Sequence, residues 1–177
     1  MSAQPSLTYS GDVAAEPADI TLVLDFLNTL DVEDDVDVLR ESGTWRQWAQ
    51  DRGLRAGALT AGVQARDALR AAVGDPAARQ ERVRTAIQIE LTGAGPELTS
   101  TDAVGAVLAA AARLNVLGEW ERMKICPADD CRWAFFDHSR NRSRTWCSMQ
   151  VCGNREKARA WRERAAAEQA GQGAAIE

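Results

Sequence analysis

Four cysteines lie close together near the C-terminal end of the 177-residue sequence, which contains no others. They form two pairs, with four residues inside each pair and fifteen between the pairs: Cys126, Cys131, Cys147 and Cys152. Two close pairs joined by a short insert are typical of a tetrahedral zinc site, in which each pair supplies two thiolates from one tight loop. Because four thiolates close the coordination shell, the spacing predicts a structural zinc site with no open position for catalysis.

Three other arrangements of these cysteines are possible. An iron–sulfur cluster also accepts four thiolates. Two disulfides would require an oxidising compartment, yet the opening residues MSAQPSLTYSGDV lack the basic and apolar regions of a secretory signal. Four unrelated buried thiols would not be expected to gather within one short segment. We therefore expect zinc as the structural cofactor of a cytoplasmic protein.

Basic residues flank the second cysteine pair on both sides. Before it, arginine alternates with small polar residues in SRNRSR (139–144), and on a strand or a tight loop these arginines would project to one side. After it, arginines recur at i, i+4 and i+7, which places them in one stripe on a helix. Arginine binds phosphate oxygens bidentately and reads guanine edges. The sequence thus predicts nucleic-acid contacts at Arg140, Arg142, Arg144, Arg155, Lys157, Arg159 and Arg162.

The net charge of −5 conceals a division of the chain. Residues 1–121 hold 10 basic and 19 acidic side chains, whereas residues 122–164 hold 11 basic and 5 acidic ones. An acidic body joined to a basic module is expected when one end of a protein meets a polyanion. Double-stranded DNA is therefore the expected partner. The alternative is a zinc-organised protein-interaction module whose basic face docks on an acidic partner, or on this chain's own body.

RNA binding is a third hypothesis. It requires Trp133, Phe135 and Trp146 to be exposed for base stacking. The same aromatic residues would otherwise form the small core of the cysteine-rich module.

Nothing in the sequence assembles into a catalytic group. His138 is the sole histidine, and no nucleophile motif accompanies it, so we expect no enzyme. No run approaches the roughly 18 apolar residues of a membrane span. Asp25, inside the apolar stretch LVLDFLNTL, needs a hydrogen-bonding partner if it is buried. A role for Asp25 and Asn28 in sensing a small-molecule effector is the alternative.

The predicted helices and strands divide the chain into a mainly helical body and a cysteine-rich zinc finger. Apolar spacing predicts a mainly helical body, in which Trp45 and Trp48 are core residues. The alternation in 86–92, followed by GAGP, predicts a β-hairpin. Within the body we expect helices over 20–30, 45–52, 60–73 and 103–117, and a further one beginning at Pro76. Gly53 is expected to end the second of these helices in the left-handed conformation, and Asp102 to cap the fourth. The predicted fold class is α+β, with a zinc finger built from a knuckle, a β-hairpin in the insert 132–146 and a helix.

The stretch CGNREKARAW, which begins at Cys152, is expected to lead from the metal site into that helix. Gly153 would take a positive φ to turn the chain, and Asn154 would cap the helix. The resulting organisation has four parts: a loose arm (1–18), a mainly helical regulatory domain that could form a homodimer (19–120), a zinc finger (121–168) and a frayed tail (169–177).

Residues Cys126–Arg155, CPADDCRWAFFDHSRNRSRTWCSMQVCGNR, resemble the CGNR zinc finger, which is named for the tetrapeptide found here at Cys152–Arg155. The stretches LVLDFLNTL and WRQWAQDRGL resemble the ABATE domain that usually precedes this finger in bacterial proteins. Such proteins are regarded as stress-response transcriptional regulators. The resemblance implies that the four cysteines are zinc ligands and that the neighbouring arginines contact nucleic acid.

Overall fold

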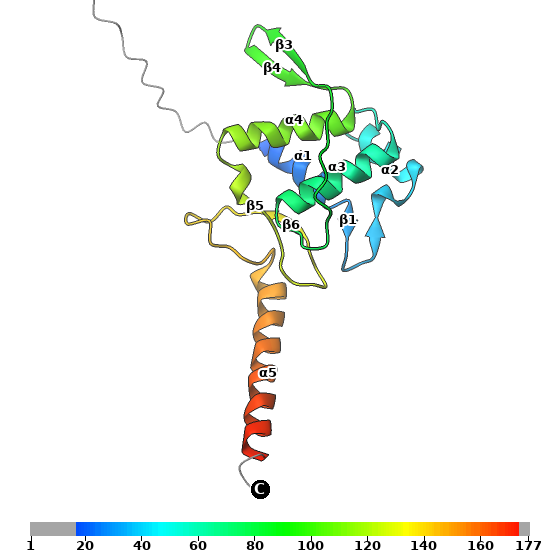
Figure 1. Ribbon diagram of the computed structural model, residues 1–177. Coiled ribbons are helices and arrows are strands. Elements are labelled where there is room, and N and C mark those ends of the chain that lie inside the picture. Colours follow the sequence, from blue (N-terminus) through cyan, green and yellow to red (C-terminus); the bar gives the residue numbers. More distant parts are fainter. Residues whose placement is uncertain (1–16, 174–177) are drawn as a thin grey trace, which may run out of the picture.

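The computed structural model describes residues 17–173 and is mainly helical, with three two-stranded antiparallel hairpins (Figure 1). Its long helices are α1 (Pro17–Leu27), α2 (Ser42–Gln50), α3 (Leu59–Ala72), α4 (Ala103–Val116) and α5 (Asn154–Gly173). The hairpins are β1 (Leu30–Asp31) with β2 (Val36–Asp37), β3 (Gln88–Thr92) with β4 (Gly95–Thr99), and β5 (Met123–Ile125) with β6 (Ala134–Phe136). Short helical turns are η1 (Val38–Arg40), η2 (Trp120–Arg122) and η3 (Met149–Gly153). The predicted α+β class is confirmed.

Helices α1, α3 and α4 pack together around one apolar core. Phe26 of α1 is fully buried, and its ring lies 5.5 and 6.0 Å from those of Trp48 and Trp45. The two indoles stack at 5.3 Å, so the prediction that they are core residues is confirmed. Pro17 opens α1, where its fixed φ suits the first turn. Residues 1–16 of the expected arm lie outside the described residues.

Two of the expected local signals are confirmed. The Asp102 carboxylate accepts a hydrogen bond from the backbone N–H of Gly105 and so caps α4. Gly53 has φ +68° just after α2, a conformation that favours glycine. The β-hairpin was also predicted correctly, with Ile89 opposite Leu98.

The helix expected from Pro76 is absent, since residues 76–78 form a turn and residues 79–87 have no regular secondary structure. Two features account for the error. The Asp75 carboxylate accepts hydrogen bonds from the side chains of Arg70 and Arg132, and also from the backbone N–H of Ala77. The following residues present only Val83 and Ile87 as large apolar side chains, too few to bury a helical stripe.

The β-hairpin expected inside the cysteine insert is also wrong. Strand β6, which follows the first cysteine pair, joins β5, which precedes it, with Met123 opposite Phe136. Met123, Ile125, Ala134 and Phe136 are buried in the same core as the helices. The cysteine-rich segment is therefore built onto the helical body and shares its apolar core across residue 120.

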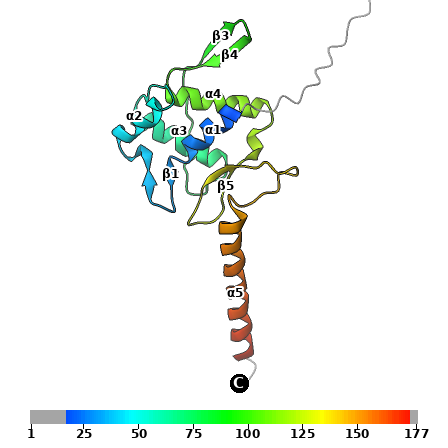
Figure 2. The same cartoon turned by 180° about the vertical axis from the view of Figure 1, so that it is seen from behind.

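Helix α5 extends away from the rest of the protein in both views (Figures 1 and 2). It continues to Gly173, beyond the residue at which we expected the tail to fray, and residues 174–177 lie outside the described residues. None of the described helices is both long enough and apolar enough to cross a membrane.

Candidate metal centre and its basic surroundings

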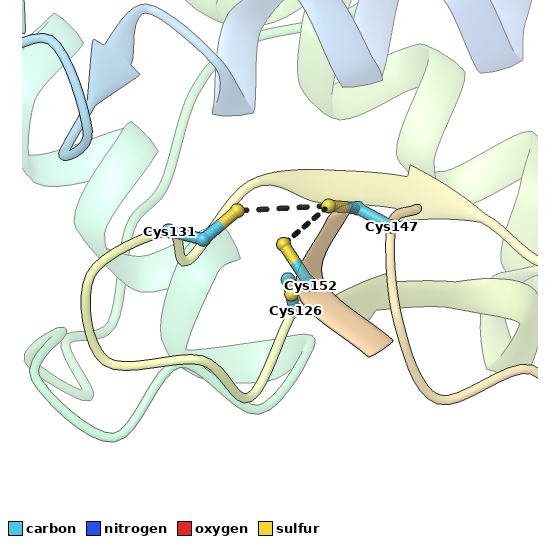
Figure 3. Close-up of side chains that lie close together, drawn as sticks. All are labelled: Cys126, Cys131, Cys147 and Cys152. Carbon is cyan, nitrogen blue, oxygen red and sulfur yellow. Dashed lines mark hydrogen bonds between the residues drawn. The ribbon is translucent and has the colours of Figure 1, made fainter. Parts of the chain in front are cut away.

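The four cysteine sulfurs converge on one point beneath the helical body (Figure 3). All four lie within 4.8 Å of one another, and Cys147 Sγ lies 3.6 Å from both Cys131 Sγ and Cys152 Sγ. A tetrahedral centre with metal–sulfur bonds of about 2.3 Å has sulfur–sulfur edges of about 3.8 Å. The arrangement fits a four-thiolate metal site, as predicted.

Backbone hydrogen bonds position the first cysteine pair. Cys126 directly follows β5, and its N–H donates a hydrogen bond of 2.9 Å to Trp133 O, just before β6. The loop that joins the first cysteine pair (126–131), here called the knuckle, turns back at Ala128. The Ala128 carbonyl accepts hydrogen bonds from the backbone N–H groups of Cys131 and Arg132 at 3.0 and 3.1 Å. Arg132 leaves the knuckle with φ +52°, a left-handed conformation that is uncommon outside glycine.

The second cysteine pair lies at the entrance to α5, but the local geometry differs from the prediction. Ser148 caps the π-helical turn η3, its hydroxyl accepting the N–H of Val151, so the helical chain begins before Asn154. Asn154 instead donates its side-chain amide to Gln150 O at 3.0 Å. The prediction of Asn154 as the helix cap is therefore wrong.

Gly153 does not have the positive φ that we expected, and its role is spatial. A Cβ atom at this buried position would lie 2.6 Å from Met149 Sδ and 3.3 Å from Trp146 Cδ1. These side chains close over the turn next to Cys152. A larger residue at position 153 would therefore require the flexible Met149 side chain to move away.

Burial and hydrogen bonds together shift the pKa values of Cys126, Cys147 and Cys152. Burial raises the pKa of Cys147, and it raises the pKa of Cys152 to about 12. Burial acts in the same direction on Cys126, but the backbone N–H groups of Cys147 and Ala128 outweigh it and lower the pKa of that thiol. Four thiolates this close repel one another, so a bound cation is what would allow all of them to ionise.

His138 and the aromatic residues of the insert lie in different environments. The His138 ring meets Phe136 edge-on at 4.8 Å, outside the cysteine group. Phe135 is buried against the cysteines, with Trp146 packed beside it, and Trp133 is exposed. The aromatic set that RNA stacking would need is therefore largely used in packing.

Asp137 is a residue that sequence reasoning missed. Its side chain is fully buried at the end of β6 and accepts hydrogen bonds from Lys124 Nζ at 2.7 Å, Ser139 N at 2.8 Å and Arg144 N at 2.9 Å. The same ammonium group donates to Arg142 O and Arg144 O. This pair fixes both ends of the arginine-rich segment. The available signal was an acidic residue directly after two phenylalanines and shortly before SRNRSR.

Asp137→Asn is expected to loosen the arginine-rich loop while leaving the metal in place. Burial alone would raise the Asp137 pKa, but the hydrogen bonds from Lys124, Ser139 and Arg144 outweigh it and lower the pKa. The carboxylate therefore stabilises the fold above its unfolded pKa, and this contribution is lost as the pH falls through the folded value. We expect hydrogen exchange at Ser139 and Arg144 to accelerate on the order of tenfold at neutral pH. Unchanged exchange would contradict this assignment.

The arginine-rich segment is a turn, the second of the two forms expected for it. Arg142 sits at φ +51° and pairs with the exposed Glu121 at 2.6 Å. Arg144 donates to the carbonyls of Trp146 and Cys147, and its guanidinium lies 5.0 Å from the Phe135 ring. Arg140 is exposed and makes no ion pair with any other described residue.

The predicted residues of α5 also divide into two groups. Arg155 bonds to Glu33 at 2.6 Å and Asp130 at 2.9 Å, and its hydrogen bonds to these carboxylates raise its pKa. Arg159 pairs with neighbouring glutamates of the same helix. Lys157 and Arg162 are exposed, and neither forms an ion pair within residues 17–173.

Polar links join the helical body to the cysteine-rich segment. Asn28 donates to Ala134 O and accepts from Ala134 N, at 3.0 and 2.8 Å, so its amide completes the pairing of strand β6. Asp25 lies elsewhere, in an ion pair of 2.6 Å with Arg52, which confirms that it has a charged partner. The hypothesis of an effector site at Asp25 and Asn28 gains no further support from these contacts.

A family comparison agrees with the geometry of the metal centre. Residues 122–165 match the CGNR zinc finger family, a segment that contains all four cysteines, the arginine-rich turn and the first half of α5. No curated protein was found to match the chain. The cysteine-rich part is thus similar to the CGNR zinc finger, and it has the geometry of a metal-binding module built onto a helical body.

Proposed function

We propose that the protein binds duplex DNA and regulates transcription without catalysing a reaction. In this proposal, zinc bound by the four cysteines fixes the arginine-rich turn and the start of α5, and these two segments contact the DNA. The helical part, residues 19–120, would act as an ABATE-like regulatory domain, with dimer formation or a small effector as its means of control. The role in stress responses follows from the same resemblance.

One observation carries this proposal. The arginine-rich turn and α5 leave the body next to each other at the metal centre, and α5 stands free of the body along its length (Figures 1 and 2). Most side chains between Asn154 and Ala167 are exposed, and the basic ones outnumber the acidic ones. A fixed basic turn beside a projecting helix suits the two requirements of duplex recognition, phosphate contacts and groove entry.

Salt-dependent duplex binding tests the proposal. With six or more phosphate contacts, affinity should fall on the order of a thousandfold between 50 and 200 mM salt. Arg140→Ala should weaken binding about tenfold and lower the salt slope by about one. Arg46→Ala, which removes an exposed charge from α2, is the matched control and should bind normally. Selection of fragments from a random duplex library would then define any sequence preference.

A protein-interaction module is the second candidate, and the Arg155–Glu33 contact favours it. In this contact a basic residue of the metal-binding module already docks on a carboxylate of the body. This alternative predicts no duplex binding by the wild type, even at 50 mM salt, with zinc fully bound. Measurable duplex affinity that responds to Arg140→Ala would exclude it as the sole function.

A further inference from the structure

Helix α5 carries basic side chains on two opposite faces. With 100° per residue, positions i, i+4 and i+7 share a face, and positions shifted by two residues fall roughly on the other side. The first face consists of Arg155, Arg159 and Arg162, and the second of Lys157, Trp161 and Arg164. Since α5 projects from the body, neither face is covered over most of its length (Figure 2).

Carboxylates neutralise the first face. Arg155 holds Glu33 at 2.6 Å and Asp130 at 2.9 Å. Arg159 holds Glu156 one turn earlier and lies 4.0 Å from Glu163 one turn later. Four carboxylates therefore stand against Arg155 and Arg159, while Arg162 has no ion pair among the described residues. A polyanion approaching Arg155 and Arg159 would meet repulsion from groups that already occupy their guanidinium donors.

The second face has the opposite character. Lys157 and Arg164 are exposed, and within the described part of the chain neither has a carboxylate partner. Trp161 lies between them with 66% of its surface exposed. A tryptophan placed between two unpaired cations is the composition of a binding hot spot for an anionic partner, because the indole adds apolar contact where the charges bring the partner close.

We propose that Lys157, Trp161 and Arg164 form the face of α5 that contacts duplex DNA. The inference rests on the proposed DNA binding and names the surface responsible for it. The two cations neutralise phosphates on either side of a groove, and the indole meets the groove edge, where thymine methyl groups supply apolar contact. Arg155 and Arg159 then serve to attach and stabilise the helix.

Two single-charge variants, two residues apart on opposite faces of the helix, provide a matched test. Lys157→Ala should weaken duplex binding about three- to tenfold and reduce the salt slope by about one. Arg159→Ala removes the same charge from the first face and should change affinity less than twofold. Both should keep full metal content. If Arg159→Ala is the more damaging variant, the assignment of faces is wrong, although DNA binding itself stands.

The indole gives a second readout. Trp161→Phe should retain most affinity, whereas Trp161→Ala should lose about tenfold, within the range for a lost aromatic contact. Titration with duplex should change the intrinsic fluorescence of the wild type, and Trp161→Phe should lack most of that change. An identical change in both proteins would overturn the proposal. If the wild type and every variant fail to bind duplex, the proposed function falls together with this inference.

Discussion

Replacing Cys147 with serine is expected to abolish metal binding and to disorder the cysteine loops without unfolding the helical body. The serine hydroxyl is not a thiolate, so only three ligands remain. Structural zinc supplies about 10–16 kcal/mol of apparent binding free energy in isolated finger peptides, which is ample to organise short loops. Metal analysis should show about one zinc per chain in the wild type and almost none in the variant.

The extent of disorder distinguishes this expectation from one based on sequence alone. A self-contained finger would unfold throughout residues 122–164. In this fold, however, Met123 and Phe136 are 3% and 7% exposed within the core of the helices. Strands β5 and β6 should therefore keep slow hydrogen exchange, while the knuckle and residues 146–153 exchange rapidly.

Thr145→Ala is the control for Cys147→Ser, because Thr145 is exposed and lies two residues away. It should keep its metal and the wild-type exchange pattern. Retention of one zinc per chain in Cys147→Ser would contradict the four-thiolate site. Loss of protection in β5 and β6 would contradict the shared core.

The clustering of the four cysteines could be predicted from sequence because their spacing is a covalent property of the chain. Two pairs of cysteines with short gaps can reach one cation in many backbone conformations, so the error in the insert hairpin did not affect the ligand set. The confirmed cap at Asp102 and the turn at Gly53 are local in the same sense, since each depends on a few neighbouring residues.

The partners of polar residues far apart in sequence could not be predicted. Asn28 pairs with the backbone of Ala134, 106 residues away, and nothing in LVLDFLNTL specifies that contact. Gly153 shows a related limit, because the sequence suggested a special φ whereas the crowding comes from Met149 and Trp146. Such roles depend on tertiary packing, to which residue type alone is a poor guide.

The electrostatics of α5 could be read only in part. The i, i+4, i+7 spacing correctly placed three arginines on one face of a helix. That Arg155 would meet Glu33 depended on the position of the β1–β2 turn, which no local pattern gave. A charge stripe in a sequence thus identifies a surface, while its ion pairs decide whether that surface is open to a partner.

Arg70→Met is expected to destabilise the protein by about 3–5 kcal/mol, the range for breaking a buried ion pair from one side. Arg70 is fully buried at the end of α3 and donates to Asp75 Oδ2 at 2.7 Å, Leu27 O at 2.8 Å and Arg132 O at 2.8 Å. It thereby joins α1, the turn after α3 and the metal-binding knuckle. Methionine fills the space but leaves two carbonyls and part of a carboxylate unpaired.

Chemical denaturation of the two proteins would measure this effect. Arg79→Met, at an exposed position without an ion pair among the described residues, is the control and should lie within about 0.5 kcal/mol of the wild type. Arg70→Met/Asp75→Asn should recover part of the loss, because the double variant no longer buries an underpaired carboxylate. A single variant as stable as the control would contradict the structural role of this pair.

The pH dependence of the stability difference between the wild type and Arg70→Met tests the role of the Asp75 charge. Burial would raise the Asp75 pKa, but Arg132, the Ala77 N–H and Arg70 outweigh it and lower the pKa. A depressed pKa stabilises the fold above the unfolded value, and the contribution disappears as the pH falls through the folded value. The difference in free energy of unfolding between the wild type and Arg70→Met should therefore become smaller as the pH is lowered. Arg70 donates a hydrogen bond to the carbonyl of Arg132, the residue after Cys131. Arg70→Met should therefore also release zinc to a chelator faster than the wild type at neutral pH. Such a result would show that the core of the helical body stabilises the metal centre.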